Sequence, residues 1–169
     1  MAGTTSTQVP RIASWVNRRT KGRPTPAAFL RFHRWLYLKS GGHFGHGLIG
    51  APCLVLTTTG RRSAVQRSTV LVYAREDDRY VVAASNDGLD RDPSWLLNVR
   101  AEPNVKLQVG CYLLDGTARV VERSDPDYSR LWSTVNTVNH DRYDSYQAKT
   151  SRPIPLVIVE ATDPHTTMG

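Results

Sequence analysis

The chain has 169 residues, of which 40% are hydrophobic and 22% are charged, so it is the size of one domain that buries a hydrophobic core. Its formal net charge is +7, and no apolar run approaches the roughly 18 residues of a membrane-spanning helix. Residues 1–10 also lack the apolar centre of a secretory signal, and together these features favour a cytoplasmic protein.

Positive charge is concentrated in the first half of the chain. The segment before Glu76, the first acidic residue, carries 12 Lys and Arg. Such a distribution predicts an anionic partner: a polyanionic cofactor tail, an anionic membrane surface or a nucleic acid. The sequence has no helix-turn-helix, zinc-finger or aromatic RNA-binding signature, so we expect no nucleic-acid partner.

The first 40 residues predict a basic N-terminal extension. Residues 1–10 are typical of a disordered tail, and residues 12–23 form a short basic helix in this interpretation. Residues 27–39 predict an amphipathic helix with Phe29, Phe32 and Leu36 on one face. This helix either covers the folded domain or lies on an anionic membrane surface, which would make the protein peripheral at the inner face of the membrane.

No metal site is expected. His43 and His46 form an H-x-x-H pair, but no carboxylate or cysteine accompanies them locally. Cys53 and Cys111 lie in strand-like runs without a metal-type spacing, and we expect both to be buried thiols in a reducing compartment.

The stretch 51–67 organises the rest of the chain. Residues 53–58 are apolar and β-branched, which predicts a buried strand, and a turn rich in cations follows it. Gly60 can take a positive φ there at little cost, and Arg61, Arg62 and Arg67 lie near the bend. Guanidiniums beside backbone N–H groups and hydroxyls suit an anion, although a hairpin with merely solvated arginines is the alternative.

The next elements predict an antiparallel hairpin and a helix. Residues 68–73 and 79–85 read as strands joined by a turn at 76–78. Asp92 is expected to cap a helix that Pro93 starts, that carries Trp95 and that ends at Glu102 and Pro103.

The remaining elements are two strands, a helix and a final strand. Strands are expected at 105–109 and 112–121, with Asp115 and Gly116 marking a turn or a bulge. Residues 124–136 predict a helix, with Leu131, Trp132 and Val135 at apolar positions, and 156–161 predict the last strand. Five or six strands with flanking helices and no βαβ regularity predict an α+β protein built on an antiparallel barrel.

Residues 139–149 form a second informative stretch. If they make a helical turn, Tyr143 and Tyr146 lie on one face at i, i+3, and His140 is a further three residues back. Two phenols and an imidazole would then point toward one cleft. Structural phenols that cap the barrel are the alternative.

Three sequence blocks together resemble the deazaflavin-dependent nitroreductase family. They are L-T-T-T-G-R-R-S at 56–63, V-V-A-A-S-N at 81–86 and P-S-W-L-L-N-V-R-A-E-P-N-V at 93–105. The resemblance runs from about residue 41 to 160 and implies an FMN-binding-like split β-barrel over 41–163, with a tail at 164–169. The chain departs from the family pattern at Ala64, where glycine is usual, and at Leu96, where tyrosine often follows the tryptophan.

The resemblance also implies a cofactor, coenzyme F-420, a deazaflavin with a phosphate and an oligoglutamate tail. FMN, which lacks the glutamate tail, is the less favoured cofactor. The tail would lie along Thr58, Thr59, Gly60, Arg61, Arg62 and Arg67. The ring would lie near Val72, Tyr73, Ala83, Ala84, Ser85, Asn86 and Trp95. Ordinary strand packing is the alternative for the alanines, and a place in the core is the alternative for Trp95.

The implied function is hydride transfer from reduced coenzyme F-420 to a quinone or a nitroaromatic acceptor. Ser85, Tyr143 and Tyr146 are the predicted catalytic residues, because a hydroxyl near the ring donates a hydrogen bond where negative charge develops. A non-catalytic binder of a flavin, lipid or other anion on the same barrel is the alternative function. Split barrels of this kind often pair, so a homodimer is also considered.

Overall fold

The computed structural model of this chain describes residues 50–161 and a two-residue strand at 166–167. The predictions for the extension 1–40, including its membrane contact, lie outside the described residues. So do the His43 and His46 pair and the predicted domain boundaries at 41 and 163.

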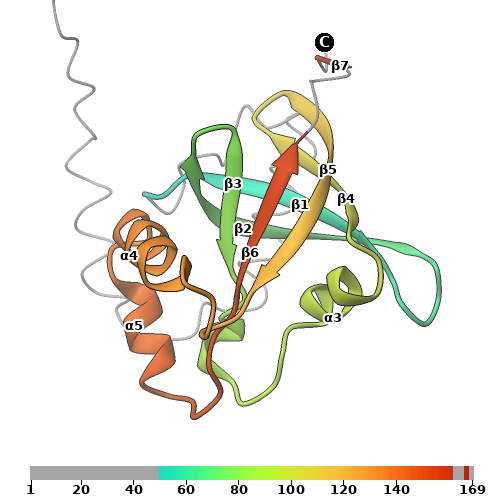
Figure 1. Cartoon of the computed structure of the whole chain (residues 1–169). Coiled ribbons are helices and arrows are strands. Elements are labelled where there is room, and N and C mark those ends of the chain that lie inside the picture. Colours follow the sequence, from blue (N-terminus) through green and yellow to red (C-terminus); the bar gives the residue numbers. More distant parts are fainter. Residues whose placement is uncertain (1–49, 162–165, 168–169) are drawn as a thin grey trace, which may run out of the picture.

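Six antiparallel strands form a closed barrel (Figure 1). They are β1 (Cys53–Thr59), β2 (Gln66–Glu76), β3 (Arg79–Ala83), β4 (Asn104–Val109), β5 (Tyr112–Val121) and β6 (Leu156–Ala161). The order is β4-β1-β2-β3-β6-β5, and β5 pairs again with β4 to close the ring. A short strand, β7 (Thr166–Thr167), pairs with the start of β5. The antiparallel split barrel predicted from the sequence is therefore confirmed.

In the part of the chain that the structure describes, three α-helices and one 3-10 turn flank the barrel. They are the 3-10 turn η1 (Asn86–Gly88) and the helices α3 (Ser94–Ala101), α4 (Tyr128–Val138) and α5 (Arg142–Gln147). In Figure 1, α4 and α5 lie together on one side of the barrel, and α3 lies on the other. None of the helices in the described part of the chain is long and apolar enough to cross a membrane.

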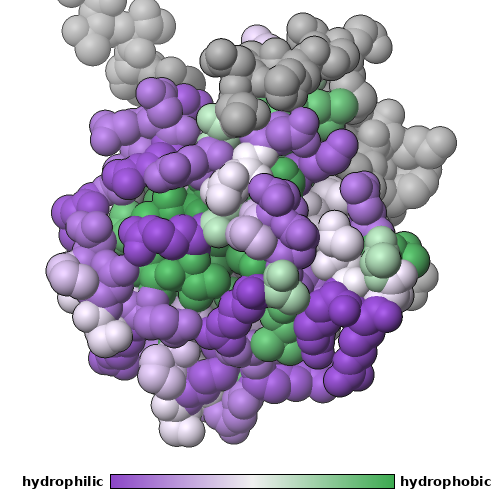
Figure 2. Space-filling model, turned by 45° about the vertical axis from the view of Figure 1, so that its right-hand side comes forward, coloured by the Kyte–Doolittle hydropathy of each residue, from purple (hydrophilic) through white to green (hydrophobic). Residues whose placement is uncertain are grey.

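The strands contribute side chains to two hydrophobic cores, because successive side chains point to opposite faces of a sheet. Val82 and Val157 point into the barrel, where they pack with Leu54, Leu56 and Leu107. The neighbouring residues Val81 and Ile158 point outward and pack under the helices with Leu131, Val135 and Tyr143. The helices α4 and α5 therefore cover one outer face of the barrel. On the face that Figure 2 presents, hydrophilic residues surround a hollowed hydrophobic area.

Two helix starts differ from the predictions. Asp92 does not cap α3, whose N-cap is Pro93 without a side-chain hydrogen bond, because both Asp92 carboxylate oxygens pair with arginines. The helix predicted from residue 124 starts at Tyr128. There, Asp125 Oδ1 accepts the backbone N–H of Asp127 at 3.0 Å, which makes a turn before the helix.

Gly116 marks neither a turn nor a bulge. It lies inside β5, opposite Val105 of β4 and Ala161 of β6, and its register is regular. A Cβ at this position would lie 2.8 Å from the Glu160 carbonyl oxygen. Glycine is therefore needed at this position, because β5 pairs here with both β4 and β6 and the backbones approach closely.

Candidate functional site

The turn between β1 and β2 carries the predicted arginine cluster. The Gly60 N–H donates to the Val65 carbonyl at 2.9 Å, and the Ala64 N–H donates to the Gly60 carbonyl at 2.7 Å. The positive φ in this turn belongs to Ala64, at 55°, and not to Gly60. Space at Gly60 is tight, since a Cβ there would lie 2.8 Å from Ser63 Oγ and 3.0 Å from the Val65 carbonyl oxygen.

We expect Ala64→Gly to stabilise the fold by about 0.5–1 kcal/mol. The left-handed conformation costs an L-residue about 1–2 kcal/mol, and the greater freedom of glycine in the unfolded chain offsets part of the gain. Urea denaturation measures the change. Ala148→Gly is the matched control, because Ala148 has a φ of −67° and the same substitution should destabilise there. Equal effects at the two positions would contradict a strained Ala64.

The three arginines of the turn are available to an anion. Arg61, Arg62 and Arg67 are all exposed, and within residues 50–161 none of them makes an ion pair. They therefore form a local excess of positive charge at this end of the barrel. A polyanion is the ligand that such an end attracts most strongly.

Asn98 fixes this turn to the barrel, a role that the sequence did not reveal. It is 4% exposed on α3, its Nδ2 donates to Thr58 Oγ1 at 3.1 Å, and its Oδ1 accepts the Arg61 N–H at 3.2 Å. One feature of the sequence pointed to this role: Asn98 is a polar amide among apolar helix residues such as Leu96 and Val99, which are both buried. Asn98 is therefore a positioning residue for the arginine turn.

Thr58 and Thr59, predicted to act together, point to opposite faces of β1. Thr58 is buried against Asn98, whereas Thr59 lies on the outer face with Thr57 and Gln66. That outer face includes a shallow cleft of about 410 Å³, which these residues line together with residues of β4 and β5. Thr59 is therefore the threonine that an outside ligand reaches.

The predicted ring residues divide between the two cores. Ala83 is 4% exposed and packs under α4 and α5, whereas Ala84 is fully buried inside the barrel. Tyr73 and Trp95 are half-buried and pack against the barrel core. Strand packing, the alternative stated for the alanines, thus describes their side chains in this structure. The half-buried members of the set are Val72, Tyr73, Ser85, Asn86 and Trp95.

Ser85 and Asn86 open a strained loop that packs on α5. Asn86, Asp87 and Gly88 have positive φ values of 47°, 57° and 81°. A Cβ on Gly88 would lie 2.6 Å from the Tyr146 carbonyl oxygen, so the loop touches the helix. Consecutive residues held in sparsely populated backbone conformations concentrate at functional sites.

Tyr143 and Tyr146 lie side by side on α5, as predicted. They are 5% and 4% exposed, and their ring centroids are 6.2 Å apart. Burial raises the pKa of Tyr143, with smaller contributions from Cys53 and Tyr146. Burial also raises the pKa of Tyr146, and the negative charge of Asp87 adds to this rise. Both phenols therefore stay protonated at neutral pH and are hydrogen-bond donors.

His140 does not share this face, contrary to the prediction. It has a φ of 56° and precedes α5, and its Nε2 lies 2.9 Å from the Gly50 carbonyl oxygen. The left-handed pair His140 and Asp141 turns the chain between α4 and α5, so the imidazole points away from the two phenols.

Arg152 is a second positioning residue that the sequence did not reveal. Its side chain is 14% exposed and pairs with Asp92 at 2.9 Å. Its Nη2 donates to the carbonyls of Ala84 and Ser85, at 3.2 Å each, and its Nε donates to the Leu89 carbonyl at 3.4 Å. One guanidinium thus holds the whole loop from Ala84 to Asp92.

The arginine turn and the Ser85 loop lie at opposite ends of the β1–β2 pair. Cys53 pairs with Val72, next to the end of β3, and Thr59 pairs with Gln66, next to the turn. Six residue steps along a strand span about 20 Å. Figure 1 shows the turn on the far side of the barrel from α5. A ligand that contacts both ends must therefore be extended. Among residues 50–161 no cluster of His, Cys, Asp or Glu could hold a metal ion.

Comparisons with known proteins agree on one family. A family model described as F420H(2)-dependent quinone reductase matches residues 29–161. An F420H(2)-dependent quinone reductase of Mycobacterium tuberculosis is 42% identical over 149 residues, which are 88% of this chain and 97% of the relative. A putative F420H(2)-dependent quinone reductase of the same species is 30% identical over 64% of this chain and 88% of its own length.

Solved structures agree with these relatives. One described as an F420-H2 dependent reductase has a TM-score of 0.57 and 37% identity, and it covers 64% of this chain and 94% of its own. Another, described as a domain-swapped dimer, has a TM-score of 0.60 and 34% identity over 80% of this chain and 100% of its own. The haem storage protein HutZ of Vibrio cholerae has a TM-score of 0.52 at 12% identity, over 66% of this chain and 82% of its own, and shares the fold alone.

Proposed function

This chain belongs to the F420H(2)-dependent quinone reductase family, and on that premise we propose how its residues serve the transfer of a hydride from reduced coenzyme F-420 to a quinone. The chain is an enzyme of this type, with reduced coenzyme F-420 as its reductant. Family membership thus decides against the alternative of a non-catalytic binder. A nitroaromatic acceptor remains a proposal, based on the charge that its oxygens, like those of a quinone, gain on reduction.

The observation that carries the proposal is the placement of charge at one end of an extended strip. The strip runs along β1 and β2 from the arginine turn to the loop that carries Ser85. Three exposed arginines lie about 20 Å along β1 from the loop that carries Ser85. Coenzyme F-420 has a planar ring at one end and an anionic tail at the other, so its charge matches the strip. In this proposal Arg61, Arg62 and Arg67 hold the tail, and Thr59 adds a hydroxyl at the same end of β1, on the face opposite Arg67. The bound deazaflavin supplies the hydride.

Ser85 and the two tyrosines serve the ring end in this proposal. The Ser85 hydroxyl donates to the polar edge of the ring. Tyr146 is favoured over Tyr143 as the donor to the acceptor, because the loop that carries Ser85 packs on Tyr146: a Cβ on Gly88 would lie 2.6 Å from the Tyr146 carbonyl oxygen. A protonated phenol stabilises the negative charge that develops on the acceptor oxygen.

The activity assay is direct. The full chain is mixed with reduced coenzyme F-420 and menadione, and the fluorescence of the oxidised cofactor is followed with time. Fluorescence should return only when protein, reductant and quinone are all present. A nitroaromatic compound in place of menadione tests the wider acceptor range. No enzyme-dependent oxidation with either acceptor would overturn the proposed activity.

Tyr146→Phe should lower kcat by about 10- to 100-fold and leave the Kd for coenzyme F-420 within about twofold. The hydroxyl acts on charge that appears only in the transition state, whereas the ring packing is kept. Tyr143→Phe should have a smaller effect, and Tyr112→Phe is the control, since Tyr112 is exposed on β5. Unchanged turnover in both α5 variants would leave the two phenols as structural caps. A loss of cofactor affinity alone would place them on the cofactor side.

Three further assignments accompany this proposal. Residues 41–163 form the cofactor-binding domain, residues 1–40 form the basic extension, and residues 164–169 form a tail. The extension makes a peripheral contact with anionic membrane from the cytoplasmic side, supported by its excess of cations. The chain forms a homodimer, supported by the relative described as a domain-swapped dimer.

A further inference from the structure

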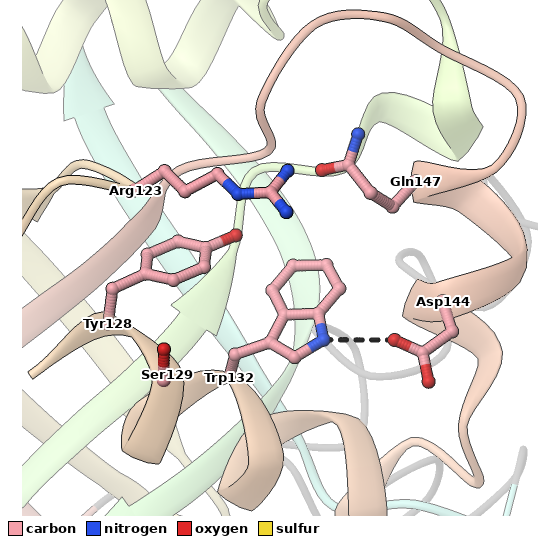
Figure 3. A pocket seen from close by; sticks show the side chains of 6 residues that line it. All are labelled: Arg123, Tyr128, Ser129, Trp132, Asp144 and Gln147. Atoms are coloured by element: carbon pink, nitrogen blue, oxygen red, sulfur yellow. Dashed lines mark hydrogen bonds between the residues drawn. The ribbon is translucent and has the colours of Figure 1, made fainter.

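A separate pocket lies between α4 and α5, next to the segment that follows β5. Its volume is about 320 Å³, and Figure 3 shows its side chains around one opening. The lining residues are Arg123, Tyr128, Ser129, Trp132, Asp144 and Gln147. None of them belongs to the strip proposed for coenzyme F-420. A volume of this size is at the lower end for small-molecule sites and suits a ligand of one or two rings.

The central wall of this pocket is a fixed aromatic plane. The Trp132 Nε1–H donates to Asp144 Oδ1 at 2.9 Å, and the indole stacks with the Tyr128 ring at 5.8 Å between centroids and 20° between planes (Figure 3). The Tyr128 hydroxyl in turn donates to the Ile154 carbonyl at 2.7 Å. Both rings are therefore held in place before any ligand arrives. A preorganised aromatic face favours a planar apolar ligand.

The polar groups of the α5 side are already used within the protein. The second oxygen of Asp144 accepts the Asn136 side-chain N–H at 2.8 Å. The Gln147 amide nitrogen donates to the Thr150 and Arg152 carbonyls, and its oxygen accepts the Ile154 N–H at 3.0 Å. These side chains therefore form walls and are not free to bind a ligand.

Arg123 and Ser129 are the two polar groups that remain. In the described part of the chain neither side chain makes a hydrogen bond, and Arg123 makes no ion pair. The Arg123 guanidinium extends over the space between Tyr128 and Gln147 in Figure 3. One unpaired cation beside a flat aromatic wall matches a single anionic group attached to a planar ring.

We propose that this pocket binds a planar aromatic carboxylate. The ring lies on the Trp132 indole, and the carboxylate accepts hydrogen bonds from the Arg123 guanidinium. A carboxylate matches the fork of a single guanidinium, and the indole face gives the ring its apolar contact. This assignment is independent of the reductase activity, because it uses none of the residues placed in the cofactor or acceptor site.

Titration of the full chain with 2-naphthoate tests the proposal. Ligand-observed NMR suits the weak affinity expected for a shallow pocket, on the order of a millimolar. Arg123→Gln should weaken binding by about tenfold. Arg119→Gln is the charge-matched control, since Arg119 is exposed on nearby β5 and pairs with Asp125. Arg123 is exposed and makes no hydrogen bond or ion pair within residues 50–161, so its variant should melt like the wild type.

Two further arms decide the chemistry and the location. The neutral analogue 2-naphthalenemethanol should bind more weakly than the carboxylate to the wild type, and the two should bind alike to Arg123→Gln. Saturating coenzyme F-420 should leave naphthoate binding unchanged. The proposal is overturned if wild type and Arg123→Gln bind naphthoate equally, if Arg119→Gln loses as much, or if the coenzyme displaces the probe. Absence of detectable binding at about ten times the expected Kd also overturns it.

Discussion

Each of the variants Arg61→Ala, Arg62→Ala and Arg67→Ala should bind coenzyme F-420 about 10- to 150-fold more weakly than the wild type at low salt. Hydrogen bonds to charged groups contribute about 1.5–3 kcal/mol each, and the exposed arginines of the β1–β2 turn have no competing ion pair among residues 50–161. Because part of the interaction is Coulombic, affinity should also fall as salt rises. Fluorescence titration at several ionic strengths measures both effects.

Charge and cofactor controls make this test specific. Arg130→Ala removes one exposed arginine on α4, far from the turn, and should leave cofactor affinity nearly unchanged. The salt dependence should flatten in each turn variant and not in this control. Flavin mononucleotide has a phosphate without a glutamate tail, so it should bind more weakly and lose less when an arginine is removed. Tighter binding of flavin mononucleotide, or wild-type affinity in all three turn variants, would refute the tail assignment.

Replacing Arg152 with alanine should give the second large effect, a loss of about 3 kcal/mol in the free energy of unfolding. The side chain is mostly buried, and its removal takes a donor from the Ala84 carbonyl, whereas the Ser85 carbonyl still accepts the Gly88 N–H at 2.9 Å. Asp92 keeps its 2.7 Å ion pair with Arg100, which limits the loss. Chemical denaturation measures the change, and hydrogen exchange over residues 84–92 locates it.

Arg152→Lys separates the two tasks of this side chain. A lysine keeps the charge beside Asp92 but cannot donate in the planar fork that reaches several carbonyls together. We expect it to recover most of the stability while the loop 84–92 still exchanges faster than in the wild type. Arg119→Ala is the control, because an exposed single ion pair contributes about 0–1 kcal/mol. Wild-type exchange in the loop of both Arg152 variants would show that Arg152 does not hold it.

Local patterns predicted the barrel strands well. The runs at 53–58, 112–121 and 156–161 match β1, β5 and β6 to within one residue, because β-branched alternation between turn residues is a short-range signal. The helical spacing i, i+3 likewise predicted that Tyr143 and Tyr146 lie on one face of α5. Local patterns did not show that Ala64 takes the positive φ in the β1–β2 turn. Which residue of a turn does so depends on the hydrogen bonds that close it.

The sequence alone determined the fold class, the basic turn and the family, because each is carried by contiguous residues such as those at 56–63 and 81–86. Tertiary structure alone decided which of these residues face outward and what holds them. The period of a strand sends Thr58 inward and Thr59 outward, and the helices α4 and α5 bury Ala83. Asn98 and Arg152 act on residues 37 and about 67 positions away. No local pattern encodes such contacts, because they arise only when the closed barrel brings distant segments together.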